Sequence, residues 1–222
     1  MLRRKIELCM TLLLLLGMII VSRKLGQLVT SENVQAEKDI VVIDAGHGGH
    51  DPGKVGVNNA LEKDINLQIA QRVKTHLEKN GLQVIMTRED DVMEDTKLED
   101  MKKRVALINE IKPAITVSIH QNSYSDASIK GAQVFYYRDS EVSKGAAEIM
   151  QEELRKVDTE NTRQIKSNSD FYMLKKTEVP TIIVECGFLS HPGEAEQLVS
   201  EEYQENMAQA ICSGIMTWLS GN

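Results

Sequence analysis

Four polar residues in this sequence are of the types that carry out metal-dependent hydrolysis, and each stands at the end of a predicted strand or helix. His47, His120 and Glu185 follow runs of apolar residues, and Glu62 begins a predicted helix. Because the carboxyl ends of parallel strands share one edge of a sheet, these side chains are expected to converge there. Two histidines and one carboxylate with an open position form the ligand set of a catalytic zinc ion. A second carboxylate that does not bind metal is the general base that such hydrolysis requires.

Each of these residues could instead have a purely structural role, and spacing alone does not decide between the two roles. A single histidine at a strand end often serves only as a hydrogen-bonding residue, and Glu62 favours a helix start through its negative charge. His50 is an alternative to His47 as a ligand, because both lie in the same glycine-rich loop. Glu185 is harder to explain structurally, since a carboxylate that follows Ile-Ile-Val is costly to bury without a partner.

The elements that must position these residues alternate between predicted strands and predicted helices. A β-branched run leads into a loop rich in glycine, and apolar residues then recur every four positions from Leu61 to Leu77. This alternation predicts an α/β fold with an open, mostly parallel sheet covered by helices on both faces. From residue 37 onward there is no repeat or linker, which predicts a single domain over 37–222. The expected strands are 40–43, 83–86, 114–119, 131–137 and 181–184, and the expected helices are 61–80, 101–108, 143–157 and 203–218.

Composition excludes several classes of protein. The 222 residues are 41% hydrophobic and 27% charged, which excludes a disordered chain. The net charge of −7 argues against nucleic acid as a partner, and the aromatic content of 4% argues against a surface that stacks on sugars or bases. Three cysteines do not make a disulfide framework, and whether Cys186 and Cys212 pair stays open.

The amino-terminal segment predicts export. Residues 8–21 form an apolar run after Arg3, Arg4 and Lys5, as in a secretory signal. As a helix this run spans roughly 21 Å, less than the roughly 30 Å hydrocarbon core of a bilayer. Residues 1–36 are therefore interpreted as a signal peptide or an uncleaved signal-anchor with a short linker, and a buried core helix is the alternative. The remaining chain has 21 basic and 31 acidic residues, so membrane contact is expected only through this segment.

Four sequence blocks resemble the zinc-dependent N-acetylmuramoyl-L-alanine amidases. The resemblance covers residues 39–220, with the blocks in the order and at the distances of that family. Because four ordered blocks are needed, the match is much more specific than the His-Gly-Gly motif alone. The blocks are 42–49 (VIDAGHGG), 61–64 (LEKD), 118–122 (SIHQN) and 184–190 (VECGFLS).

The resemblance implies a role for each site residue. His47, Glu62 and His120 would bind Zn²⁺, and Glu185 would be the catalytic carboxylate. The substrate implied is peptidoglycan, cleaved at the amide between N-acetylmuramic acid and L-alanine of the stem peptide. Asn122 is a weaker candidate for binding the substrate, with turn formation as its alternative role.

Within the family, the short chain, the single apolar segment and the Leu-Glu-Lys-Asp block are most similar to the germination-specific amidases of spore-forming bacteria. That subgroup implies action on spore-cortex peptidoglycan, on the route to muramic-δ-lactam. Some relatives require a lipoprotein activator, which makes such a protein a candidate partner. The expected location is outside the cytoplasmic membrane, in the cell wall or the forespore intermembrane space.

Two other functions are compatible with the sequence. The first is a hydrolase that uses Cys186 as nucleophile with a histidine base. Cys186 directly follows Glu185, however, so on an extended strand its side chain would point to the opposite face. The second is a catalytically silent wall-binding or scaffold protein, against which the lack of wall-binding repeats counts. A chelator that inactivates the protein where a thiol reagent does not would exclude the cysteine hydrolase.

Overall fold

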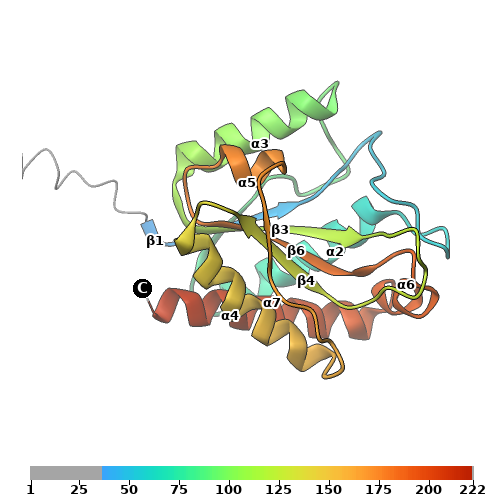
Figure 1. Cartoon of the computed structure of the whole chain (residues 1–222). Coiled ribbons are helices and arrows are strands. Elements are labelled where there is room, and N and C mark those ends of the chain that lie inside the picture. Colours follow the sequence, from blue (N-terminus) through green and yellow to red (C-terminus); the bar gives the residue numbers. More distant parts are fainter. Residues whose placement is uncertain (1–36, 222) are drawn as a thin grey trace, which may run out of the picture. The chain divides into compact units, whose positions relative to one another are not determined.

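The computed structural model describes residues 37–221, which form a six-stranded sheet with helices on both faces (Figure 1). The predicted signal or anchor segment and its boundary at residue 36 lie outside the described residues. None of the helices within 37–221 is long and apolar enough to span a bilayer. The strands are β1 (Glu37–Ala45), β2 (Gln83–Met86), β3 (Pro113–Asn122), β4 (Gln133–Tyr137), β5 (Lys166–Asn168) and β6 (Thr181–Phe188). The helices are α2 (Glu62–Lys79), α3 (Lys97–Ile111), α4 (Glu141–Val157), α5 (Tyr172–Lys176), α6 (Pro192–Leu198) and α7 (Glu201–Ser220).

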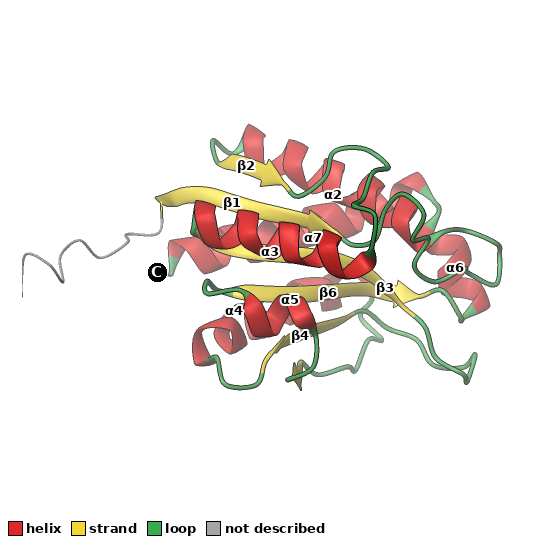
Figure 2. Ribbon diagram, turned by 90° about the horizontal axis from the view of Figure 1, so that it is seen from above, coloured by secondary structure: helices red, strands yellow, loops and turns green. Residues whose placement is uncertain are grey.

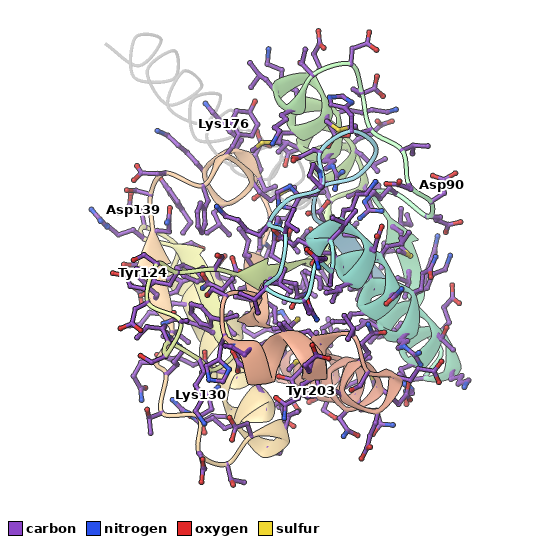
Figure 3. The ribbon with its side chains drawn as sticks, turned by 90° about the vertical axis from the view of Figure 1, so that its right-hand side faces the viewer. Asp90, Tyr124, Lys130, Asp139, Lys176 and Tyr203 are labelled. Carbon is purple, nitrogen blue, oxygen red and sulfur yellow. The ribbon has the colours of Figure 1, made fainter. Side chains whose placement is uncertain are left out.

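The strand order is β2-β1-β3-β6-β4-β5, and the neighbouring strands are parallel except for β4 and β6. The predicted fold class, an open and mostly parallel α/β sheet, is therefore confirmed. The antiparallel pairing follows from the connection between β3 and β4, which contains no helix that could return the chain to the other end of the sheet. Tyr124 and Lys130 lie on this connection, with exposed side chains (Figure 3).

Helices α2, α4 and α7 cover one face of the sheet, and α3 and α5 cover the other (Figure 2). The larger core lies under α2, α4 and α7, where the stripe predicted from Leu61 to Leu77 places Ile69, Val73 and Leu77 out of contact with solvent. The smaller core joins β1 to α3 and α5. The central strands β1, β3 and β6 are thus buried on both faces, which explains their continuous apolar sequences.

Three short elements were not predicted from the sequence: β5, α5 and α6. Each has three to seven residues, too few to show a hydrophobic period. Helix α6 is begun by His191, whose Nδ1 accepts a hydrogen bond from the Glu194 backbone N–H. The predicted strand at 83–86 appears with the same bounds, and the predicted strand at 181–184 and helix at 143–157 appear with bounds that differ by a few residues.

Candidate active site

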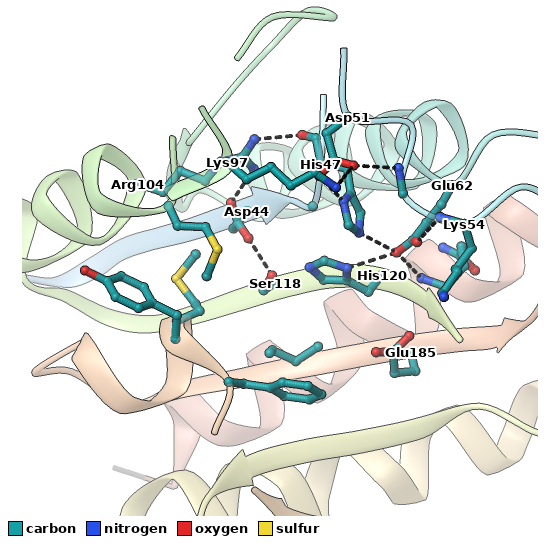
Figure 4. Close-up of a pocket in the computed structure, with 18 of the residues that line it drawn as sticks. Asp44, His47, Asp51, Lys54, Glu62, Lys97, Arg104, Ser118, His120 and Glu185 are labelled. Atoms are coloured by element: carbon teal, nitrogen blue, oxygen red, sulfur yellow. Dashed lines mark hydrogen bonds and ion pairs between the residues drawn. The ribbon is translucent and has the colours of Figure 1, made fainter. Parts of the chain in front are cut away.

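The four candidate residues arrive from four elements at the carboxyl end of the parallel strands (Figure 4). His47 lies in the loop after β1, Glu62 is the first residue of α2, and His120 lies near the end of β3. Glu185, on β6, is the register partner of His120. The convergence expected from the sequence is therefore present in the structure.

His47, Glu62 and His120 form a compact cluster. Oε1 of Glu62 lies 3.2 Å from Nε2 of His47 and 2.9 Å from Nδ1 of His120. One ligand atom from each of the three residues lies within 4.8 Å of the others, and the two imidazole rings meet edge to face at 5.0 Å. Among the described residues, these three side chains are the ones placed closely enough to share a metal ion.

Two glycines make room for this cluster. A Cβ atom at Gly46 would lie 2.2 Å from Cε1 of His120, so the imidazole packs directly on the backbone there. A Cβ atom at Gly53 would lie 2.6 Å from Oε2 of Glu62 and 2.8 Å from Cδ2 of His47, and Gly53 has a φ of +67°. Both positions therefore require glycine: Gly46 for space, and Gly53 for space and backbone conformation.

Glu62 lies where its negative charge is stabilised. The backbone N–H of Lys54 donates to Oε2 at 2.8 Å, and that of Gln121 donates to Oε1 at 3.1 Å. As the first residue of α2, Glu62 also lies at the positive end of the helix dipole. Burial raises the pKa of Glu62, but the hydrogen bonds from His120 and His47 lower it more, so that it lies well below its usual range. Glu62 is therefore ionised, as a metal ligand must be.

Glu185 has the opposite electrostatic environment. Its Oε2 atom is buried and has no hydrogen-bond partner among the described residues. Burial raises the pKa of Glu185, the charge of His120 lowers it and the charge of Glu62 raises it, and together these effects bring it to about 7. A buried carboxyl group whose pKa is near neutrality is suited to accept and return a proton. The two carboxyl groups of the site thus have pKa values shifted in opposite directions, lower for Glu62 and higher for Glu185, which supports different chemical roles for them.

Asp51 orients His47, and the sequence analysis did not identify it. Its Oδ2 atom lies 2.8 Å from Nδ1 of His47, and its Oδ1 atom lies 2.6 Å from Nζ of Lys97. A carboxylate beside Nδ1 favours a proton on that atom, so a metal ion in the cluster could be bound through the Nε2 lone pair. The available sequence signal was an acidic residue four positions after His47 in the same loop.

The cluster opens into a cavity of about 490 Å³. Its lining includes Glu185 and the two histidines. The volume lies in the range of small-molecule binding sites. The lining also includes the apolar side chains of Met93, Met101, Phe171, Met173 and Ile183.

The remaining candidates have other environments. Asn122 lines the cavity, and its Oδ1 atom accepts a hydrogen bond from the Ser123 backbone N–H, which matches the turn-forming alternative. His50, the alternative to His47, is exposed and lies outside the ligand cluster, so the geometry favours His47. Cys186 is fully buried, and burial raises the pKa of its thiol far above neutrality. Cys186 and Cys212 are both free thiols.

Comparison with known proteins identifies the family of this chain. Residues 41–217 match the family model described as N-acetylmuramoyl-L-alanine amidase. The germination-specific N-acetylmuramoyl-L-alanine amidase of Bacillus subtilis is 38% identical over 190 residues, which cover 82% of this chain and 80% of that protein.

Two solved structures share the fold. The CwlD amidase from Clostridioides difficile, solved in complex with the GerS lipoprotein, is 38% identical with a TM-score of 0.80, covering 83% of this chain and 100% of that chain. The catalytic domain of CwlV, an N-acetylmuramoyl-L-alanine amidase from Bacillus (Paenibacillus) polymyxa var. colistinus, is 33% identical with a TM-score of 0.75. It covers 83% of this chain and 99% of that chain. On its sequence blocks, fold and matched length, this chain belongs to the N-acetylmuramoyl-L-alanine amidase family.

Proposed function

We propose that this protein is a zinc-dependent amidase that acts on spore-cortex peptidoglycan outside the cytoplasmic membrane. Membership of the family gives the reaction, which is hydrolysis of the amide between the lactyl carboxyl of N-acetylmuramic acid and L-alanine. The cortex as substrate is supported by the similarity to a germination-specific amidase. Release of the lactyl carboxyl is the step that must precede closure of a muramic-δ-lactam ring.

The donor atoms of the cluster suit a zinc ion. Ligands bound about 2.0–2.1 Å from one zinc in a tetrahedral arrangement lie roughly 3.3 Å apart. The observed separations from Glu62 Oε1 are 3.2 Å to His47 Nε2 and 2.9 Å to His120 Nδ1. Two imidazoles and one carboxylate, opening into a cavity, match the ligand set of catalytic rather than structural zinc sites. A bound zinc ion supplies Lewis acidity, which polarises a carbonyl group and lowers the pKa of water.

Glu185 provides the proton transfers of the reaction. Its unpartnered Oε2 atom is free to accept a proton from the attacking water, and the proton is then returned to the alanine nitrogen as the amide bond breaks. Because burial and Glu62 hold the pKa of Glu185 at about 7, the carboxyl group binds and releases this proton without a large free-energy difference. Asp51 keeps His47 in one tautomer and orientation throughout.

The environment of the Cys186 side chain argues against a hydrolase that uses it as nucleophile. Its side chain is out of contact with solvent, and its thiol has a raised pKa because burial and the neighbouring Glu185 both disfavour the thiolate. A nucleophilic cysteine needs an accessible thiolate. The silent scaffold is disfavoured by Glu185, because its buried Oε2 atom without a hydrogen-bond partner costs stability, and a scaffold gives that atom no task.

Location and partner are part of the same proposal. The basic residues and apolar run within 1–36 support export with either cleavage or retention as an anchor. A lipoprotein partner is supported by the similarity to CwlD, which has been solved with GerS. Neither partner nor anchor is needed to explain the chemistry of the site.

The observation that carries the proposal is the cluster of His47, Glu62 and His120 beside Glu185. The test is digestion of purified cortex peptidoglycan, followed by mass spectrometry of the products and measurement of new amino-terminal alanine. We expect muramic acid with a free lactyl carboxyl, formed only when zinc is present and lost after chelation. A requirement for a purified lipoprotein would be found by repeating the digestion with the candidate partner added. Products cut within the glycan or the stem peptide, or turnover that survives complete metal removal, would contradict the proposal.

A further inference from the structure

His47 has an unusual backbone conformation for a residue with a side chain. Its φ is 61°, in the left-handed region that residues other than glycine rarely adopt. Such a conformation costs free energy and persists only where the surrounding structure enforces it. The flanking residues Gly46 and Gly48 permit the turn but do not hold it. Asp51 contacts the His47 side chain from within the loop, so the question is which further contacts fix the His47 backbone.

Two buried arginines hold the carbonyl groups of this loop. Arg88 donates to the Ala45 carbonyl at 2.9 Å and to the Gly46 carbonyl at 3.1 Å. Arg104 donates to the Ala45 carbonyl at 2.6 Å and to the His47 carbonyl at 2.7 Å. Both arginines are only 5% exposed. Three consecutive carbonyl groups are thus fixed by guanidinium groups, and Arg104 is the one that holds His47 itself.

Arg104 is in turn fixed by two carboxylates. Its Nη1 atom donates to Oδ1 of Asp44 at 2.9 Å, and its Nε atom donates to Oδ2 of Asp100 at 2.6 Å. The other oxygen of Asp44 accepts the hydroxyl hydrogen of Ser118, its register partner on β3 (Figure 4). Ser118 lies two residues before His120. One guanidinium group therefore connects the loop that carries His47 to the strand that carries His120.

We propose that Arg104 is a positioning residue that holds His47 in its left-handed, metal-binding conformation and couples it to the strand of His120. Arg104 acts through the His47 backbone, and no atom of it belongs to the ligand cluster. The role requires the planar guanidinium group, because its N–H groups donate hydrogen bonds in fixed directions to two carboxylate and two carbonyl oxygens. A lysine there would keep the charge and lose most of these directed hydrogen bonds. This inference rests on the proposed zinc site.

The test compares Arg104→Lys with Arg88→Lys in the purified full chain. The two arginines are equally buried and receive the same substitution, but Arg88 does not contact the His47 carbonyl. Three quantities are measured: zinc affinity against a competing chelator, the visible absorption spectrum of the cobalt-substituted protein, and the thermal midpoint of the metal-free protein. A third variant, Asp100→Asn, weakens the support of Arg104 while leaving the arginine in place.

For Arg104→Lys we expect a loss of zinc affinity of at least about ten-fold, as for other residues that orient metal ligands, and a changed cobalt spectrum. Arg88→Lys should lose clearly less affinity at a comparable thermal midpoint. Wild-type zinc affinity in Arg104→Lys, or equal losses in the two lysine variants, would overturn the inference. If Arg104→Lys does not fold, Asp100→Asn decides: weakened zinc binding supports the inference and unchanged binding overturns it. Failure of the wild-type protein to bind zinc would instead refute the proposed function.

Discussion

His120 and Glu185 are register partners on the neighbouring parallel strands β3 and β6, so a candidate metal ligand and the candidate base are placed side by side by the backbone of the sheet. Both strands are buried and central, with β1 beyond β3 and β4 beyond β6. The separation of these two side chains therefore does not depend on a loop. Sites built on such elements are held more rigidly than sites built on loops. Of the three candidate ligands, His47 is the one on a loop, and it is accordingly the one that needs additional support.

Replacing Gly53 with alanine should damage the proposed metal site. The added Cβ atom would meet Glu62 Oε2 at 2.6 Å and His47 Cδ2 at 2.8 Å. Gly81→Ala is the matched control, because Gly81 also has a positive φ, of +83°, but nothing lies within 4 Å of its Cβ position. We expect both variants to lose about 1 kcal/mol of stability from backbone strain. Only Gly53→Ala should also lose zinc, measured by elemental analysis after dialysis, and retention of full zinc by this variant would contradict the packing described here.

Asp51→Ala should weaken zinc binding by about 10-fold to 100-fold, because His47 loses the acceptor that fixes its tautomer. Lys97→Met is the control, since it removes the other partner of Asp51 and leaves the contact with His47 intact. The side chain of Lys97 is 67% exposed, so its ion pair contributes little. Zinc affinities of the two variants can be compared by competition with a chromogenic chelator. Equal losses would mean that charge near the loop, rather than the orientation of His47, sets the affinity.

Asp44 should make the metal-free protein sensitive to acid. Burial raises the pKa of Asp44, but Arg104 and the hydroxyls of Ser118 and Thr87 lower it more, to about 2 against an ordinary value of 3.8. Because the pKa in the folded state is lower, the ionised carboxylate stabilises the fold above about pH 4, and this contribution is lost as the pH falls from 3.8 towards 2. The contribution corresponds to about 2 kcal/mol.

The measurement is urea unfolding of metal-free wild type and Asp44→Asn at about pH 5 and about pH 2.5. The metal is removed because its ligands also titrate in acid. The destabilisation caused by Asp44→Asn should be smaller at the lower pH, because Asp44 is then protonated in the unfolded wild-type chain while it is still partly ionised in the folded one, so that ionisation stabilises the fold less. A destabilisation that is the same at both values would show that the charge of Asp44 is not what stabilises the fold.

Cys186→Ala should remain active, and the native protein should resist thiol reagents. The side chain is fully buried, and burial raises the pKa of the thiol, so the reactive thiolate is scarce and inaccessible. Turnover is measured with and without iodoacetamide and, separately, with and without a chelator. We expect loss of activity with the chelator alone. Loss of turnover in Cys186→Ala, at an unchanged thermal midpoint, would support the cysteine hydrolase instead.

Much of the site could be predicted because three of its residues follow apolar runs in the sequence. A polar side chain directly after such a run, as at His120 or Glu185, has few structural reasons to be there. Parallel strands bring such ends together, and the helix stripe that starts at Leu61 places Glu62 beside them. The sheet, its mostly parallel character and the long helices follow from the same pattern of apolar runs and helical periods.

The supporting residues could not be predicted, because their roles depend on contacts between distant segments. Arg104 lies on the predicted helix around 101–108, where a charged residue ordinarily faces solvent, yet it is 5% exposed. Its contacts with Asp44 and with the His47 carbonyl join residues about 60 positions apart in the chain. Asp51 lies in a loop whose glycines permit many conformations. The antiparallel direction of β4 was signalled only by the missing helix between β3 and β4.

The central claim is that Glu185 performs chemistry at a metal site built by the other three residues, and Glu185→Gln tests it most directly. The substitution keeps size and removes the ability to act as a base. We predict that the purified variant retains the same zinc content as the wild type, while turnover on cortex peptidoglycan falls by about 10²–10⁴-fold. His120→Ala, measured alongside, should lose zinc and turnover together. Normal turnover by Glu185→Gln, or loss of its zinc, would contradict the account.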